Sequence, residues 1–403
     1  MAKNTNLHDA KRAKQDEFYT QWVDIEKEMN AYLDYDQDVF KDKTILLPCD
    51  DPEWSNFTKF FALHFQDYGI KKLISTSYAP KSNMEGQFYS PELTLFNYDQ
   101  YDELKDYERG KIFILDGTDE NNDGRVNIED FKWEYLEGDG DFRSDEIKAL
   151  RDEADMVITN PPFSLFREFV AWLVEGDVEF SVIGNMNAIT YKEVFPLIKE
   201  NKMWIGATNF NTGMYFRVPD SFQYAKSYKF ARERNGVKVS RVPGVCWFAN
   251  IQHGRRHEPL PLMTMEDNLR FNKRINKNPN SYKKYDNYDA IEVPVTAGIP
   301  EGYAEERWVS PQEYDDLIHN GFHCEILDER EREILIQILN PAMGVPISFL
   351  DKYNPGQFNI IGGTANGQVP LFIKKKGFKS YNNPLLGDKK FYQRIIIQHK
   401  IRE

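Results

Sequence analysis

Cysteines are few in this sequence, and segments that cross a membrane or direct secretion are missing. The three cysteines, Cys49, Cys246 and Cys324, lie far apart in a chain of 403 residues, which argues against a disulfide framework and a cysteine-based zinc site. No apolar run approaches the roughly 18 to 20 residues that span a bilayer, and the polar N-terminus lacks the apolar centre of a signal peptide. The seven histidines show no paired ligand spacing. We therefore expect a cytoplasmic protein with no membrane partner and no catalytic metal.

The composition is that of a folded protein with a locally basic C-terminal part. Hydrophobic residues make up 41% and aromatic residues 14% of the chain, and a length of about 150 residues per domain predicts two to three domains. The net charge of −13 argues against nucleic acid as a partner, but residues 351–403 carry ten basic and three acidic side chains. Such a local basic face attracts phosphates. A solvated lysine-rich tail explains the same charges equally well.

Short apolar runs alternate with helical stretches in the first half of the chain. The expected strands are residues 44–49, 72–77, 111–115, 155–159 and 180–184. The expected helices are residues 7–36, with a break at 16–21, then 54–68 and 164–174. Strands that alternate with helices at this spacing indicate parallel βαβ units. We therefore predict an α/β sheet with helices on both faces.

The pattern changes after about residue 200, where short aromatic and β-branched runs predominate. The expected strands are 213–217, 237–242, 245–250, 347–350, 357–361 and 394–398, and a helix is expected at 311–320. We place a domain boundary near residue 250. This predicts an α/β domain at 1–250 and a smaller α+β domain at 251–403.

The tetrapeptide Asn160-Pro161-Pro162-Phe163 stands directly after an expected buried strand and before an expected helix. Ligands of parallel α/β sheets bind at the carboxyl ends of the strands. An exocyclic amine on an aromatic ring is a poor nucleophile because its lone pair is delocalised into the ring. The Asn160 side-chain oxygen and the Pro161 carbonyl could accept its two N–H groups, which would favour a tetrahedral nitrogen with a free lone pair. The prolines stiffen the turn, and Phe163 can stack on a flipped base. The alternative is a strand-ending turn without function.

Five stretches of the sequence resemble those of one family. They are DEFYTQ (residues 16–21), PCDDPEWSNF (48–57), GDGDFRS (138–144), ADMVITNPPFSLFREF (154–169) and GNMNAITYKE (184–193). In this order they are similar to the EcoRI-type adenine-specific DNA methyltransferases, which use S-adenosylmethionine. The resemblance covers most of residues 10–250 and, more loosely, the C-terminal part.

The resemblance implies a Rossmann-like methyltransferase domain at 1–250 and a target DNA recognition domain at 251–403. It implies that residues 160–163 are the catalytic tetrad for methylation of the adenine N6 amine. The residues that it implies for cofactor binding are Phe18, Tyr19, Thr20, Pro48, Cys49, Asp50, Asp51, Asp141 and Phe142. The Gly-rich loop of most methyltransferases is absent, as in the EcoRI-type family, and no acid for the cofactor ribose follows the second strand. Alternative roles are the start of a helix for Asp50 and Asp51, a core position for Tyr19 and a turn for Asp141.

Duplex DNA is the partner that the resemblance implies, and basic side chains in the C-terminal half are the expected phosphate contacts. These are Arg255, Arg256, Lys374, Lys375, Lys376, Lys379, Lys389, Lys390 and Arg394. We expect a monomer, with a cognate restriction endonuclease that acts separately. Two alternatives stay open: methylation of an RNA base or a protein glutamine by the same tetrapeptide, and a non-catalytic DNA-binding relative with a decayed cofactor site.

Residues 119–130 match the ligand spacing of a calcium-binding loop. Oxygen ligands fall on Asp119, Asn121, Asp123, Asn127 and Asp130, with a glycine at the sixth position. Aspartate in place of glutamate at the last position predicts weak binding, and the strand expected before the loop argues against a complete EF-hand. One hypothesis is a structural calcium site followed by a helix at 131–136, and the other is an acidic surface turn.

Overall fold

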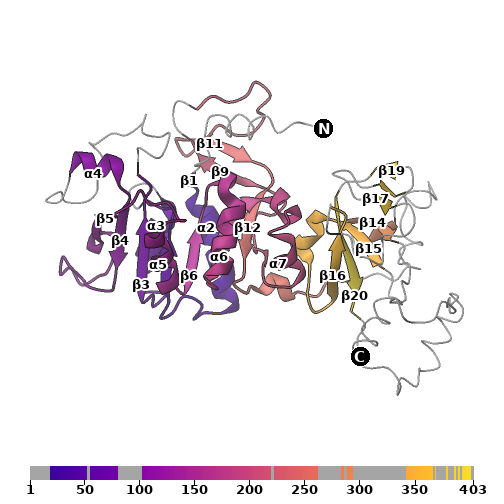
Figure 1. Ribbon diagram of the computed structural model, residues 1–403, viewed down its shortest axis with the longest axis horizontal. Coiled ribbons are helices and arrows are strands. Elements are labelled where there is room, and N and C mark those ends of the chain that lie inside the picture. Colours follow the sequence, from indigo (N-terminus) through magenta and orange to yellow (C-terminus); the bar gives the residue numbers. More distant parts are fainter. Residues whose placement is uncertain are drawn as a thin grey trace, which may run out of the picture. The chain divides into compact units, whose positions relative to one another are not determined.

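The structure is a computed structural model that describes residues 19–51, 55–79, 102–218, 222–261, 342–365, 368 and 393–400. Five further strands are described by their backbone alone: Lys283–Tyr285 (β13), Tyr288–Val293 (β14), Phe378–Lys379 (β17), Leu385–Leu386 (β18) and Lys389–Lys390 (β19). The chain divides into two compact units, Met1–Arg256 and His257–Glu403, and each has sheets of its own (Figure 1).

The first unit is built on an eight-stranded sheet in the order β5-β4-β3-β2-β6-β7-β12-β8. In chain order these strands are Thr44–Leu47 (β2), Lys72–Thr76 (β3), Lys111–Leu115 (β4), Lys132–Tyr135 (β5), Met156–Thr159 (β6), Glu179–Asn185 (β7), Trp204–Ile205 (β8) and Val245–Ala249 (β12). The central strands β3, β2, β6 and β7 are parallel, whereas the outer strands pair antiparallel. The carboxyl ends of four neighbouring strands therefore meet at one edge of the sheet.

Helices bury both faces of the central strands. They are Trp22–Tyr35 (α2), Asn56–Leu63 (α3), Glu103–Glu108 (α4), Asp145–Glu153 (α5), Phe166–Glu175 (α6) and Phe195–Lys199 (α7), with 3-10 helices at Ile128–Asp130 (η2), Phe163–Leu165 (η3), Met186–Thr190 (η4) and Gly254–His257 (η5). Ile45 and Leu47 of β2 belong to the core shared with α2 and α3. The intervening Leu46 is also fully buried. The ring centre of Phe166 in α6 lies 5.2 Å from that of Phe248 in β12. Burial on both faces explains why β2 is apolar without alternation.

A second, antiparallel sheet of the first unit has the order β1-β9-β11-β10. Its strands are Tyr19–Thr20 (β1), Met214–Arg217 (β9), Glu233–Arg234 (β10) and Val237–Val242 (β11). Glu28 of α2 fixes the chain that leads into it, because its buried carboxylate accepts the backbone N–H groups of Ala207 and Thr208, each at 2.8 Å. The Tyr32 hydroxyl donates to the same carboxylate at 2.8 Å.

The second unit is mostly β-structure in its described part. A five-stranded antiparallel sheet has the order β13-β14-β15-β20-β16, and β17, β18 and β19 form a separate small sheet. The strands described with side chains are Ala342–Pro346 (β15), Phe358–Gly363 (β16) and Arg394–His399 (β20), and Ile347–Lys352 (η6) is a 3-10 helix. Val345, Phe349, Phe358 and Ile396 are fully buried and form part of its core.

Most expected strands are confirmed, and three expectations are wrong. The strand at 111–115 is present as β4 but pairs antiparallel with β3 rather than parallel. The expected helix at 131–136 is the strand β5, whose alternating exposure suits an edge strand. The expected strand at 347–350 is the 3-10 helix η6. The expected helix at 311–320 lies outside the described residues, and among those described no helix is both long and apolar enough to cross a membrane.

Candidate active site

The tetrapeptide at residues 160–163 lies at the carboxyl end of β6, between the ends of β2 and β7. Pro161 is buried, whereas Asn160, Pro162 and Phe163 are half-buried. The backbone N–H of Leu165 donates to the Pro162 carbonyl at 3.0 Å, which opens η3 and then α6. The tetrapeptide therefore forms the turn between a buried strand and a covering helix, at the edge where ligands of parallel sheets bind.

The small sheet of the first unit covers part of this edge. The Phe163 ring lies 6.5 Å from the ring of Phe216 in β9, at an interplanar angle of 81°. Just beyond the end of β7, the Met186 N–H donates to the Gly244 carbonyl at 2.6 Å, in the turn between β11 and β12. Both contacts place the sheet of β9 and β11 beside residues 160–163.

Asp50 joins the end of β2 to the tetrapeptide. Its carboxylate accepts the hydroxyl of Thr159 at 2.5 Å and the hydroxyl of Ser55 at 2.6 Å. Asp50 is 4% exposed, and burial raises its pKa to about 6. Because Thr159 directly precedes Asn160, a single side chain links the turn after β2 to the tetrapeptide. The alternative of a helix N-cap is wrong for Asp50, because Ser55 caps α3.

The rest of the turn after β2 is held by β3 and by the start of α3. The Thr76 hydroxyl donates to the Pro48 carbonyl at 3.0 Å, and the Ser55 N–H donates to the Asp51 carbonyl at 2.6 Å. Cys49 is half-buried and forms no disulfide. All four residues predicted from this turn therefore lie together at the carboxyl ends of β2 and β3.

The predicted N-terminal cofactor residues are described only in part. Phe18 lies outside the described residues, and Tyr19 is described by its backbone alone. The Thr20 carbonyl accepts the side-chain amide of Asn56, at the start of α3, at 2.7 Å. Thr20 is 4% exposed, and its buried hydroxyl has no hydrogen-bond partner in the part of the chain that the structure describes. Because a buried hydroxyl without a hydrogen bond is costly, the Thr20 hydroxyl suits a site where a bound molecule supplies the hydrogen-bond partner.

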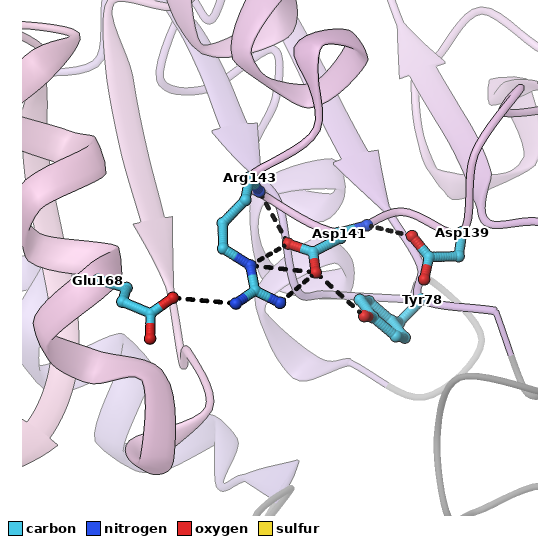
Figure 2. A network of polar contacts seen from close by, with 5 residues as sticks. All are labelled: Tyr78, Asp139, Asp141, Arg143 and Glu168. Atoms are coloured by element: carbon cyan, nitrogen blue, oxygen red, sulfur yellow. Dashed lines mark hydrogen bonds and ion pairs between the residues drawn. The ribbon is translucent and has the colours of Figure 1, made fainter.

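Asp141 lies beside Tyr78, just beyond the end of β3, as Figure 2 shows. The Tyr78 hydroxyl donates to its carboxylate at 3.4 Å, and the Arg143 guanidinium donates to it with a shortest distance of 2.6 Å. The Arg143 hydrogen bond lowers the pKa of Asp141, and burial, followed by the charge of Asp141, raises the pKa of Tyr78. Arg143 also donates to Glu168 on α6 at 2.9 Å. An acidic side chain thus stands at the end of β3, although none follows that strand in the sequence.

Phe142 and Gly140 fix the loop that carries Asp141. The Phe142 ring lies 5.0 Å from Phe169 and 5.8 Å from Trp172 of α6, and Phe142 is buried. This packing places the ring in the core beside α6, and its contact with the cofactor stays a prediction. Gly140 has a φ of +86°, and a Cβ there would clash with the Ser77 carbonyl oxygen. The loop therefore approaches the end of β3 as closely as a backbone can.

Comparison with known proteins agrees with this geometry. The family model of the adenine-specific methyltransferase EcoRI matches residues 6–317 and 325–400. The chain belongs to this family. It is 37% identical to the Type II methyltransferase M.EcoRI of Escherichia coli over 93% of this chain and 98% of that protein. It is 31% identical to the Type II methyltransferase M.MpnI of Mycoplasma pneumoniae over 97% of both chains. A search of solved structures finds no match.

The EcoRI family implies S-adenosylmethionine as the cofactor, and a calcium ion is not supported. The Asp130 carboxylate accepts the backbone N–H groups of Glu120 and Asn127, each at 2.9 Å, and the Asp119 carboxylate accepts the Gly124 N–H at 2.8 Å. The described residues contain no group of three or more His, Cys, Asp or Glu that could hold a metal ion. These oxygens stabilise the backbone of an acidic turn, which was the alternative interpretation of the loop.

Two predicted phosphate contacts are wrong. Arg256 is 4% exposed, and its guanidinium lies 3.9 Å from the centre of the Trp204 ring. Arg394 is 9% exposed and donates to the Gly344 carbonyl at 3.2 Å. Both arginines are parts of the packed interior. Arg255 donates to a backbone carbonyl of its own unit at 2.7 Å.

The predicted lysines remain untested. Lys374, Lys375 and Lys376 lie outside the described residues. Lys379, Lys389 and Lys390 lie on β17 and β19, which are described by their backbone alone. Both strands pair with β18, so these lysines belong to one small sheet.

Two features of the active-site edge have no counterpart in the sequence-based prediction. One is the hydrogen bond between Thr159 and Asp50, which are 109 positions apart, because no sequence pattern marks such a contact. The other is the segment 222–241 beside β9, which holds six basic residues, one acidic residue and four aromatic residues. A local count of charges and aromatic residues over 20 positions would mark this segment.

Proposed function

We propose that this member of the EcoRI family transfers a methyl group from S-adenosylmethionine to the N6 amine of an adenine in duplex DNA. The observation that carries the proposal is the position of residues 160–163. They lie at the carboxyl end of the central parallel strand β6. The hydrogen bond from Thr159 to Asp50 joins the end of this strand to the turn after β2. The names of the relatives, which are Type II methyltransferases, support the same reaction.

The tetrapeptide would hold the target amine. The Asn160 side-chain oxygen and the Pro161 carbonyl would accept its two N–H groups, which favours a nitrogen with a localised lone pair. Phe163 would lie against the face of the flipped base, since flipped bases are held between aromatic or apolar side chains. Positioning and electrostatics would supply most of the rate acceleration, so no side chain has to act as a covalent nucleophile.

The turn after β2, Thr20 and the loop around Asp141 would hold the cofactor. When bound, S-adenosylmethionine would supply the methyl group from a sulfonium centre. The buried hydroxyl of Thr20 fits such a ligand. Backbone atoms at residues 48–51, with the carboxylate of Asp51, would face the positively charged methionine end of the cofactor. Asp141 would face the adenine of the cofactor from the end of β3.

The second unit would recognise the DNA sequence around the target. This proposal is supported by its separation from the first unit, which contains the tetrapeptide and the proposed cofactor residues. We propose that the protein acts as a monomer, with any cognate endonuclease acting separately.

The test is transfer of a labelled methyl group to unmethylated, mixed-sequence duplex DNA, with the Asn160→Ala variant beside the wild type. We expect label in N6-methyladenine for the wild type, and a loss of about a hundredfold to a thousandfold for the variant, because it removes one of two acceptors for the amine. Cofactor binding should be retained in both. Turnover of the variant at the wild-type rate would show that residues 160–163 are not the site, and label found only on RNA or protein would exclude the DNA substrate.

A further inference from the structure

Residues 222–241, the basic segment, form an exposed cationic and aromatic surface on the first unit. Its charged residues are Lys226, Lys229, Arg232, Arg234, Lys238 and Arg241, against Glu233. This gives a net charge of +5, in a chain whose total is −13. Lys226, Lys229, Arg232 and Arg234 are exposed, and no ion pair with another described residue engages these four. The surface therefore carries a net positive charge, of which the charge of Arg234 also acts on the carboxylate of Asp24 in α2.

Aromatic rings hold several of these cations in place. The guanidinium of Arg234 lies 3.7 Å from the centre of the Tyr215 ring, and that of Arg241 lies 4.3 Å from the centre of the Phe230 ring. Tyr224 anchors the segment on the sheet, because its hydroxyl donates to the Val239 carbonyl at 2.7 Å. Cation–π contacts of this kind restrict the guanidinium groups. The guanidinium of Arg241 is held further by its hydrogen bond to the Thr212 carbonyl at 2.9 Å, whereas the exposed guanidinium of Arg234 can donate to a bound phosphate.

The two faces of β9 connect the basic segment to the active-site edge. Phe216 is fully buried and contacts Phe163 of the tetrapeptide. Its neighbour Tyr215 points to the opposite face, where Arg234 covers its ring, as expected for adjacent residues of a strand. The guanidinium of Arg234 and the ring of Phe163 therefore lie on opposite faces of β9, and β10 and most of β11, which belong to the basic segment, are strands of the same sheet.

We infer that the basic segment binds the phosphate backbone of the DNA that flanks the target adenine. The inference rests on the proposed function and assigns the substrate-binding surface of the same site. A base that enters at residues 160–163 requires its strand to pass across this edge, and unpaired lysine and arginine side chains are the groups that neutralise phosphates. Phe230, which is 42% exposed, adds an apolar ring for contact with a sugar or an unstacked base.

The test measures the binding of the full-length protein to a mixed-sequence duplex by fluorescence anisotropy, over a series of salt concentrations. The double variant Lys226→Ala with Lys229→Ala should bind about tenfold more weakly. The negative slope of log K against log salt should also become less steep by about 1.8, because each lost phosphate contact removes about 0.9 from its magnitude. Phe230→Ser should weaken binding without changing the slope, because it removes no charge.

The matched control is the double variant Lys71→Ala with Lys199→Ala, two exposed lysines outside the segment with the same change of charge. It should keep the wild-type slope, and all variants should bind S-adenosylmethionine equally. The inference would be overturned if the Lys226 and Lys229 double variant kept the wild-type slope and affinity, or if the control variant lost as much affinity. In either case, methylation of DNA by the wild type would still support the proposed function. Failure of the wild type to bind or methylate DNA would instead remove the proposed function itself.

Discussion

At the scale of single residues, Asp50 connects three segments of the active-site edge. Its carboxylate accepts the hydroxyls of Thr159 and Ser55, and its backbone carbonyl accepts the hydroxyl of Thr58 at 3.1 Å. The resemblance to the EcoRI family implies that Asp50 contacts the cofactor, whereas both of its carboxylate oxygens already have protein partners. Asp50 is therefore a positioning residue, which holds the turn after β2 against the residue before Asn160.

The raised pKa of Asp50 predicts a dependence of stability on pH. The ordinary pKa is 3.8 and burial raises it to about 6, so the folded protein binds this proton more tightly than the unfolded chain. Between about pH 4 and pH 6 the contribution of Asp50 to the free energy of unfolding therefore falls as pH rises, and it is constant at higher pH. In Asp50→Asn, the stability relative to wild type should increase by about 1 kcal/mol from pH 5 to pH 7.5.

Urea unfolding of both proteins at several pH values measures this difference. The matched control is Asp38→Asn, at a carboxylate that is 73% exposed, and its stability relative to wild type should stay level over the same range. A level difference for Asp50→Asn as well would mean that Asp50 ionises in the folded protein as it does in the unfolded chain.

At the scale of elements, the sequence predicts where strands lie better than how they pair. The β2 and β6 segments are apolar runs because they are buried on both faces, and such runs are visible in the sequence. The direction of β4 is set by its pairing with β3 and β5, which periodicity does not reveal. The tetrapeptide at residues 160–163 and the turn after β2 could be predicted from local residues. The burial of Arg256 and Arg394 could not, because it depends on partners far along the chain.

The loop that carries Asp141 gives a prediction at the same scale. In Gly140→Ala, a Cβ would clash with the Ser77 carbonyl, and a non-glycine residue at a φ of +86° is strained. We expect a loss of about 2 kcal/mol in stability and about tenfold weaker binding of S-adenosylmethionine, because the loop must move away from the end of β3. Isothermal titration calorimetry and thermal unfolding measure the two effects.

Gly124→Ala is the matched control for this substitution. Its φ is +87°, and nothing lies within 4 Å of the position of a new Cβ. It should lose only about 1 kcal/mol through backbone strain and keep the wild-type affinity for the cofactor. Equal affinities of the two variants would show that the loop at Gly140 takes no part in the cofactor site.

At the scale of the whole molecule, the change from one unit to the other occurs at a sharp point in the chain. Arg256 is held within the first unit by Trp204. The carbonyl of the next residue, His257, accepts the side-chain amide of Asn354 of the second unit at 3.1 Å. Both the tetrapeptide and the proposed cofactor residues belong to the first unit, so the chemistry and the recognition of sequence are expected to be separable.

A fragment that ends at Arg256 tests this separation. Its two sheets and their helices form a complete compact unit, so it should unfold in one cooperative transition and bind S-adenosylmethionine with the affinity of the full chain. The fragment keeps the basic segment but lacks the second unit. It should therefore bind DNA at least about tenfold more weakly and lose its preference for the cognate sequence. The binding that remains should be non-specific and sensitive to salt. Calorimetry and anisotropy with cognate and scrambled duplexes measure these properties. Full sequence preference in the fragment would place DNA recognition in the first unit, beside the basic segment.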